Sequence, residues 1–111
     1  MEKPYLLTFP MFALLLKDRT GTVFLRHGQD LLLPLFTEDT NVLTYATKTN
    51  LSEFAVEKLE LAADVGEFIS SPPNRGGSNP DFIIVLDPMD NSPHGLISWS
   101  RMDFLALLAM Y

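Results

Sequence analysis

The sequence predicts an α/β (α+β) domain with a single mixed β-sheet, N-terminal antiparallel strands and two to three packed helices. Residues 82–86 form a short apolar run between Pro80 and Asp87-Pro88, which is typical of a strand covered on both faces. Other apolar segments are separated by turn residues or spaced as in helices. With 111 residues, of which 47% are hydrophobic, the chain predicts one domain over residues 1–111.

The N-terminal third predicts three strands joined by short turns, which suggests an antiparallel meander. These strands are expected at residues 11–17, 23–26 and 31–36. Pro34 cannot donate a backbone hydrogen bond, so the third strand is expected at a sheet edge or with a bulge. The apolar run over residues 4–16 also resembles the start of a signal peptide, but Pro10 interrupts it and it is shorter than the ~20 residues that span a bilayer. We therefore expect a core strand and a cytoplasmic protein.

Two regions in the middle of the chain predict helices. Thr37 is the expected N-cap of a helix over residues 38–47, with acidic residues in its first turn. Residues 52–71 allow two interpretations: one long helix, which propensity slightly favours, or a strand at 54–59 followed by a helix at 60–70. The alternation of elements in an α/β sheet favours the second interpretation.

The last part of the chain alternates loops with short regular elements. Proline, glycine and asparagine predict loops over residues 71–80 and 89–95, and residues 96–99 predict a short strand. Ser100 and Asp103 have the spacing of a capping box and begin a final helix. This helix is apolar on nearly every side, which indicates either a core helix or one shared with another chain.

Charge and composition exclude several classes of function. Fourteen acidic and eight basic residues give a net charge of -6, and the basic residues are scattered, so nucleic-acid binding is not expected. Cysteine is absent, which excludes disulfides, thiolate catalysis and zinc-finger sites. No motif indicates a cofactor, and no set of residues indicates catalysis. Neither a nucleic acid nor a membrane is an expected partner.

The segment from Leu31 through Pro34 and Phe36-Thr37 to Asp39, a strand followed by an acidic helix start, resembles the SseB-like domain. That small bacterial α/β domain is named from an enhanced-serine-sensitivity protein. The strand that ends in Asp87-Pro88 and the final helix also fit its order of elements, so the resemblance covers residues 11–111. It implies a non-catalytic interaction or regulatory domain and supplies no catalytic residues.

The clearest chemical candidate is the Asp87-Pro88-Met89-Asp90 sequence after the expected strand at 82–86. It resembles the magnesium-binding motif of inositol-monophosphatase-like phosphatases, in which two carboxylates at the end of a strand converge on a cation. Asn91-Ser92 departs from that motif, and the chain is much shorter than that family's fold requires. The alternative, which we favour, is that Asp87 and Asp90 form turns that end the strand.

The remaining candidates have simpler interpretations. His27 and His94 lie in expected turns without a neighbouring nucleophile or second ligand, and the glycine-rich residues 75–78 lack the ending of a phosphate-binding loop. Aromatic and apolar residues near the end of the chain are candidates for a partner-binding surface or a homodimer through the last helix. These residues are Trp99, Phe104, Leu108 and Tyr111. Packing in the core is the commoner role for such residues.

Overall fold

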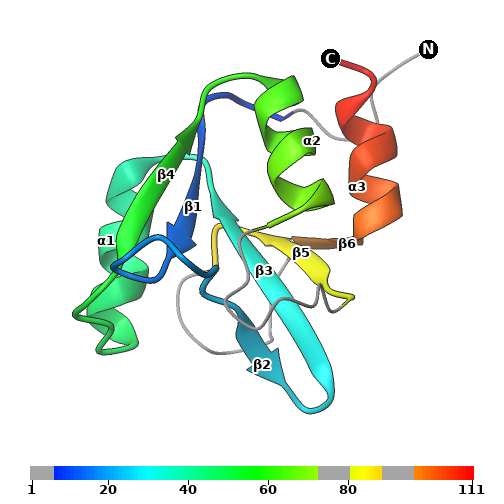
Figure 1. Cartoon of the computed structure of the whole chain (residues 1–111). Helices are drawn as coiled ribbons and strands as arrows, with labels where there is room; N and C mark the ends of the chain where they lie inside the picture. Colours follow the sequence, from blue (N-terminus) through cyan, green and yellow to red (C-terminus); the bar gives the residue numbers. More distant parts are fainter. Residues whose placement is uncertain (1–6, 73–80, 89–96) are drawn as a thin grey trace.

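The computed structural model describes residues 7–72, 81–88 and 97–111. Within these residues six strands form one mixed sheet with three helices (Figure 1). The strands are β1 (Met11–Leu15), β2 (Leu25–His27), β3 (Asp30–Phe36), β4 (Ala55–Leu59), β5 (Ile83–Leu86) and β6 (Ile97–Ser100). The helices are α1 (Asp39–Lys48), α2 (Ala62–Ser70) and α3 (Arg101–Leu108).

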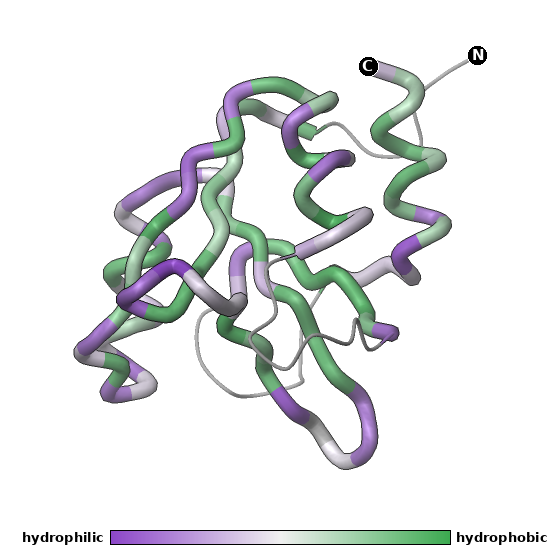
Figure 2. The backbone as a smooth tube through the Cα atoms, viewed as in Figure 1, coloured by the Kyte–Doolittle hydropathy of each residue, from purple (hydrophilic) through white to green (hydrophobic). Residues whose placement is uncertain are grey.

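The sheet has the strand order β4-β1-β3-β5-β6, with β2 paired to β3 beside β1. β3 and β5 are parallel, and every other pair is antiparallel, so the predicted mixed sheet is confirmed. Helix α1 covers one face, and α2 and α3 lie side by side on the other (Figure 1). The strands between these layers are mostly hydrophobic (Figure 2). The predicted buried strand is β5, in which Ile84 and Val85 are buried on opposite faces.

The N-terminal strands are antiparallel as predicted, but they do not form a meander. β2 and β3 form a hairpin, whereas β1 pairs directly with the end of β3. β3 therefore lies inside the sheet, and the expectation that Pro34 marks an edge or a bulge is wrong. Instead, Pro34 is fully buried and in register with Val85 of β5.

Pro34 is tolerated inside the sheet because its nitrogen faces a gap between β1 and β2. β1 pairs with β3 only at Leu35 and Phe36, and β2 pairs with it only up to Leu32. Continuing the β1 register by one step would place Leu14 opposite Pro34, which has no N–H to donate. The Leu14 carbonyl accepts a hydrogen bond from the Val23 N–H at 3.0 Å instead. β1 thus separates from β3 at the proline, and no ladder bond is lost.

The two interpretations of residues 52–71 are resolved in favour of a strand followed by a helix, β4 and α2.

The sequence predicts N-cap residues for two helices, and the structure confirms one of them. Ser100 caps α3, since its Oγ accepts a hydrogen bond from the Asp103 N–H at 3.1 Å. Thr37 does not cap α1. The N-cap residue is Glu38, and its side chain makes no capping hydrogen bond. The Thr37 side chain has another partner, Asp87.

Candidate functional site

Asp87 directly follows β5, at the end of the sheet where the parallel strands β3 and β5 both finish. Its N–H donates to the Leu35 carbonyl at 2.8 Å, which extends the parallel ladder by one residue. Its φ of 49° is left-handed, a conformation that Asp adopts more readily than most side chains. The chain therefore turns sharply here, and the carboxylate is held between the end of β3 and the start of α1.

The Asp87 carboxylate accepts three hydrogen bonds. Oδ1 accepts from the Thr37 N–H at 2.8 Å and from the Asn41 Nδ2 at 3.0 Å. Oδ2 accepts from the Thr37 hydroxyl at 2.7 Å. Thr37 precedes α1 and Asn41 lies in its first turn, so one side chain joins β5 to the β3–α1 junction across 46 to 50 residues of sequence. Hydrogen bonds that a carboxylate accepts are stronger than those between neutral groups. We call this contact of Asp87 with Thr37 and Asn41 a clamp, because it joins two distant segments of the chain.

These contacts give Asp87 a structural role and leave the metal prediction untested. A carboxylate has about four lone-pair sites, so these three donors leave about one site, on Oδ2, for another partner. Among the residues described, no group of three or more potential ligands (His, Cys, Asp or Glu) is arranged to hold a metal ion. Asp90, the second expected ligand, lies outside the described residues. His94 and the glycine-rich loop at 75–78 also lie outside them, whereas His27 ends β2.

The four predicted partner-binding residues lie close to the chain's own core. Phe104 and Leu108 are 0% and 6% exposed, so α3 directs them inward against the sheet and α2. Trp99 is half-buried, with its ring centroid 5.1 Å from that of Phe104. Tyr111 is 36% exposed, but its ring packs edge-on against Phe9 and its hydroxyl accepts the Leu7 N–H. A partner can therefore reach Tyr111 and part of Trp99, but neither Phe104 nor Leu108 unless the fold opens.

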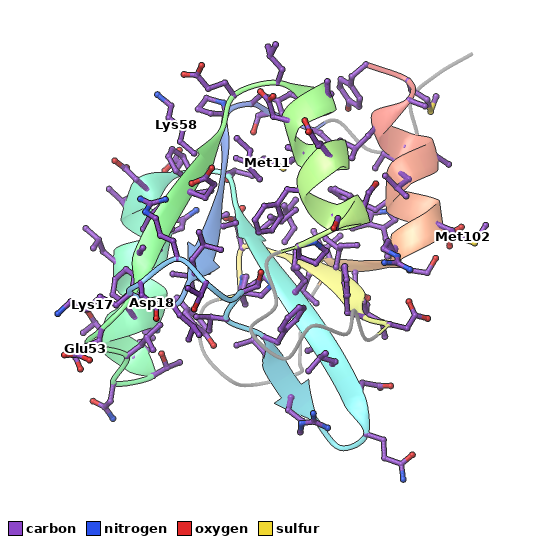
Figure 3. All side chains as sticks on the ribbon, in the orientation of Figure 1. Met11, Lys17, Asp18, Glu53, Lys58 and Met102 are labelled. Atoms are coloured by element: carbon purple, nitrogen blue, oxygen red, sulfur yellow. The ribbon has the colours of Figure 1, made fainter. Side chains whose placement is uncertain are left out.

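The outer side of α3 is the part of that helix available for contact. Met102 is 80% exposed and points away from the body of the molecule (Figure 3). Ala106 and Ala109 are exposed with it. No helix in the described parts of the chain is long and apolar enough to cross a membrane.

An open groove of about 530 Å³ lies between β4 and α2, and no motif in the sequence predicts it. Leu59 and Phe68, which are both buried, lie at its base. The remaining lining residues are polar or charged. They are Glu57, Lys58, Glu60, Asp64, Glu67 and Ser71. With four acidic residues and one lysine, this lining has a formal charge of -3.

Three of the groove carboxylates also have partners within the fold, and Glu60 pairs with Lys58 at 3.6 Å. Glu57 pairs with Arg19 at 2.7 Å, and Asp64 accepts the Leu61 N–H at 3.0 Å at the start of α2. Their positions are therefore fixed by the fold. Sequence reasoning missed the groove because its acids come from a strand, a loop and a helix that only tertiary structure brings together.

Comparisons with known proteins do not add a family to this description. No protein-family model matches the chain, and the search of curated protein sequences found no relative.

Proposed function

We propose that this chain is a non-catalytic protein-interaction domain. The observation that carries the proposal is the use of Asp87 as a clamp. The residue with the best catalytic or metal-binding pattern in the sequence is bonded to Thr37 and Asn41 inside the fold. The resemblance to the SseB-like domain supports the same function, and with it a bacterial, cytoplasmic protein.

The groove between β4 and α2 is the surface that we propose for the partner. Its apolar base, formed by Leu59 and Phe68, offers a place to bury an aliphatic or aromatic side chain. Its acidic rim favours a segment with lysine or arginine, because complementary charge speeds encounter and selects among partners. A positively charged, partly apolar segment of another protein fits both features.

A pair of charge reversals tests this proposal. Glu67→Lys changes the groove, whereas Asp30→Lys changes net charge by the same amount at the exposed start of β3. We expect proteins captured from the native cells by the wild-type chain to be lost with Glu67→Lys and retained with Asp30→Lys. If both variants retain the same proteins, the groove is not the binding surface. If the purified chain hydrolyses phosphate esters and Asp87→Asn abolishes that activity, the domain is catalytic.

The alternative function is that of a divalent-metal-binding protein or phosphoester hydrolase that uses Asp87 and Asp90. One observation favours it: Asp87 lies at the carboxyl ends of two parallel strands and beside the start of α1. Ligand sites of open α/β sheets are commonly found at such ends. A metal titration separates this alternative from the clamp, as described in the Discussion.

A further inference from the structure

Three strands of the described sheet pair on one side only: the short β2, which carries Arg26, and β4 and β6, which differ in how they are protected against pairing with another chain. β4 ends the strand order on one side, and β6 ends it on the other. An outer strand presents unpaired N–H and C=O groups, which proteins commonly block with charged side chains.

The β4 edge is blocked. Leu14 directs its carbonyl to Val23, away from β4, so Val56, opposite Leu14, directs its own main-chain groups outward. The Arg19 guanidinium lies on that edge, donating to the Val56 carbonyl at 3.2 Å and pairing with Glu57. Lys58 adds a second charge on the same strand (Figure 3).

On β6, the hydrogen-bonding pattern shows which groups face outward. The Asp87 N–H bonds to β3, so alternation along the strand directs the main chain of Ile84 and Leu86 toward β6. Trp99 and Ile97 are their partners in register. Ser98, between them, therefore directs both its N–H and its C=O away from the sheet.

No charged side chain protects this edge within the described part of the chain. The sequence of β6 is Ile-Ser-Trp-Ser, and both Ile97 and Ser98 are exposed. The nearest charged residue along the chain, Arg101, is partly exposed and contacts the residues before β5. Its guanidinium lies 5.3 Å from the centroid of the Phe82 ring and 4.0 Å from Asp81.

The side chains of β6 are complementary to a second copy of the same strand. Ile97 and Trp99 oppose Leu86 and Ile84, which belong to the core under α2 and α3, so both lie on that face of the sheet. Ile97 is 43% exposed, and Trp99 is half-buried. In a twofold dimer that places Ser98 opposite Ser98 of the partner subunit, each Ile97 lies opposite the partner subunit's Trp99. Such aliphatic–aromatic pairs stabilise antiparallel strands.

We propose that the chain forms a twofold homodimer in which β6 pairs antiparallel with β6 of a second copy, with Ser98 facing Ser98 of the partner subunit. The sheet then continues from one subunit into the other, and the contact is the same patch on both sides. A register that faces Ser98 with Ser100 is disfavoured, because Ser100 is the N-cap of α3 and its carbonyl accepts the first helical hydrogen bond. This dimer is independent of the groove, which lies at the opposite edge of the sheet.

Complementary charges at position 98 test both the dimer and its register. Wild-type protein is expected to show a concentration-dependent dimer in light scattering after size exclusion. Ser98→Lys and Ser98→Glu each place like charges face to face across the axis, and we expect the dissociation constant to rise about fivefold or more. An equimolar mixture of the two variants is expected to restore a dimer, which native mass spectrometry identifies as mixed.

Controls make each outcome decisive. Lys58→Gln changes the charge of the β4 edge by one unit, as each Ser98 variant does for β6, and is expected to leave the dimer unchanged. Ser98→Pro removes the outward N–H that the dimer uses and no N–H that bonds to β5. Circular dichroism is therefore expected to show a folded chain and light scattering a monomer, even if a charged variant fails to fold. A wild-type chain that stays monomeric up to its solubility limit overturns the dimer. Charged variants that dimerise as well as wild type, or a mixture that stays monomeric, overturn the register.

Discussion

Replacing Asp87 by Ala removes the acceptor of three hydrogen bonds and leaves their donors in a partly buried site. The donors are the backbone and side chain of Thr37 and the side-chain amide of Asn41. A hydrogen bond to a charged group contributes about 1.5–3 kcal/mol net to stability. The three bonds share one carboxylate and are not additive, so we expect a loss of about 3 kcal/mol in the free energy of unfolding.

The backbone conformation at position 87 adds a second destabilising effect to Asp87→Ala, and other variants at this position measure it separately. Because φ at position 87 is 49°, Ala is strained there by about 1 kcal/mol, whereas Gly adopts this conformation without strain. Asp87→Gly is therefore expected to be about 1 kcal/mol more stable than Asp87→Ala. Asp87→Asn keeps one oxygen acceptor and tolerates the left-handed conformation, so its loss is expected to be about 1 kcal/mol.

Urea unfolding followed by circular dichroism measures these differences, and thermal unfolding gives an independent check. For a domain of this size, 3 kcal/mol corresponds to a melting temperature lower by roughly 12 °C. Thr37→Val serves as the partner variant in a double-mutant cycle with Asp87→Ala, and a coupling energy of about 1 kcal/mol or more is expected. If Asp87→Ala is as stable as the wild type within about 0.5 kcal/mol, Asp87 does not act as a clamp.

Two further predictions test the core and the metal alternative. Phe104→Ala is expected to lower the free energy of unfolding by about 3–5 kcal/mol, because the ring is fully buried. Met102→Ala, on the exposed side of the same helix, is expected to change it by less than about 0.5 kcal/mol. Equal effects of the two variants in urea unfolding would contradict the inward orientation of Phe104. Millimolar Mg²⁺ is expected to leave the amide NMR spectrum unchanged, because the Asp87 carboxylate is already bonded. Broadening by Mn²⁺ confined to Thr37, Asn41 and Asp87 would instead favour the metal site.

Local patterns in the sequence were sufficient to predict most of the elements. Residues 82–86 are apolar without alternation because β5 is buried on both faces. The capping pair Ser100 and Asp103 marked the start of α3 because capping depends on residues three positions apart. The strand and helix within residues 52–71 could not be separated by propensity alone, since tertiary pairing of β4 with β1 decides the outcome.

The position of β3 inside the sheet could not be predicted for a different reason. Proline in a strand indicates an edge when a neighbouring strand lies on the side that its N–H would face and needs that donor. Here β1 stops pairing before Pro34, and β2 pairs only with the earlier part of β3, so nothing requires that N–H. The exception depends on the Val23 N–H, which satisfies the Leu14 carbonyl. That arrangement involves three separate segments, and no local window of sequence contains it.

The hydrogen-bond partners of Asp87 at the candidate site could not be predicted from a local window of sequence either. A carboxylate after a buried strand has the same sequence pattern whether it binds a metal or accepts hydrogen bonds from the fold. The difference lies in the donors that the tertiary structure brings to it, and for Asp87 these are Thr37 and Asn41 at the start of α1. Because the β3–β5 pair is parallel, its two strands end together, and a side chain that follows one can bond to the segment that follows the other. Asp87 therefore marks the point at which the parallel pair ends and is joined to the start of α1.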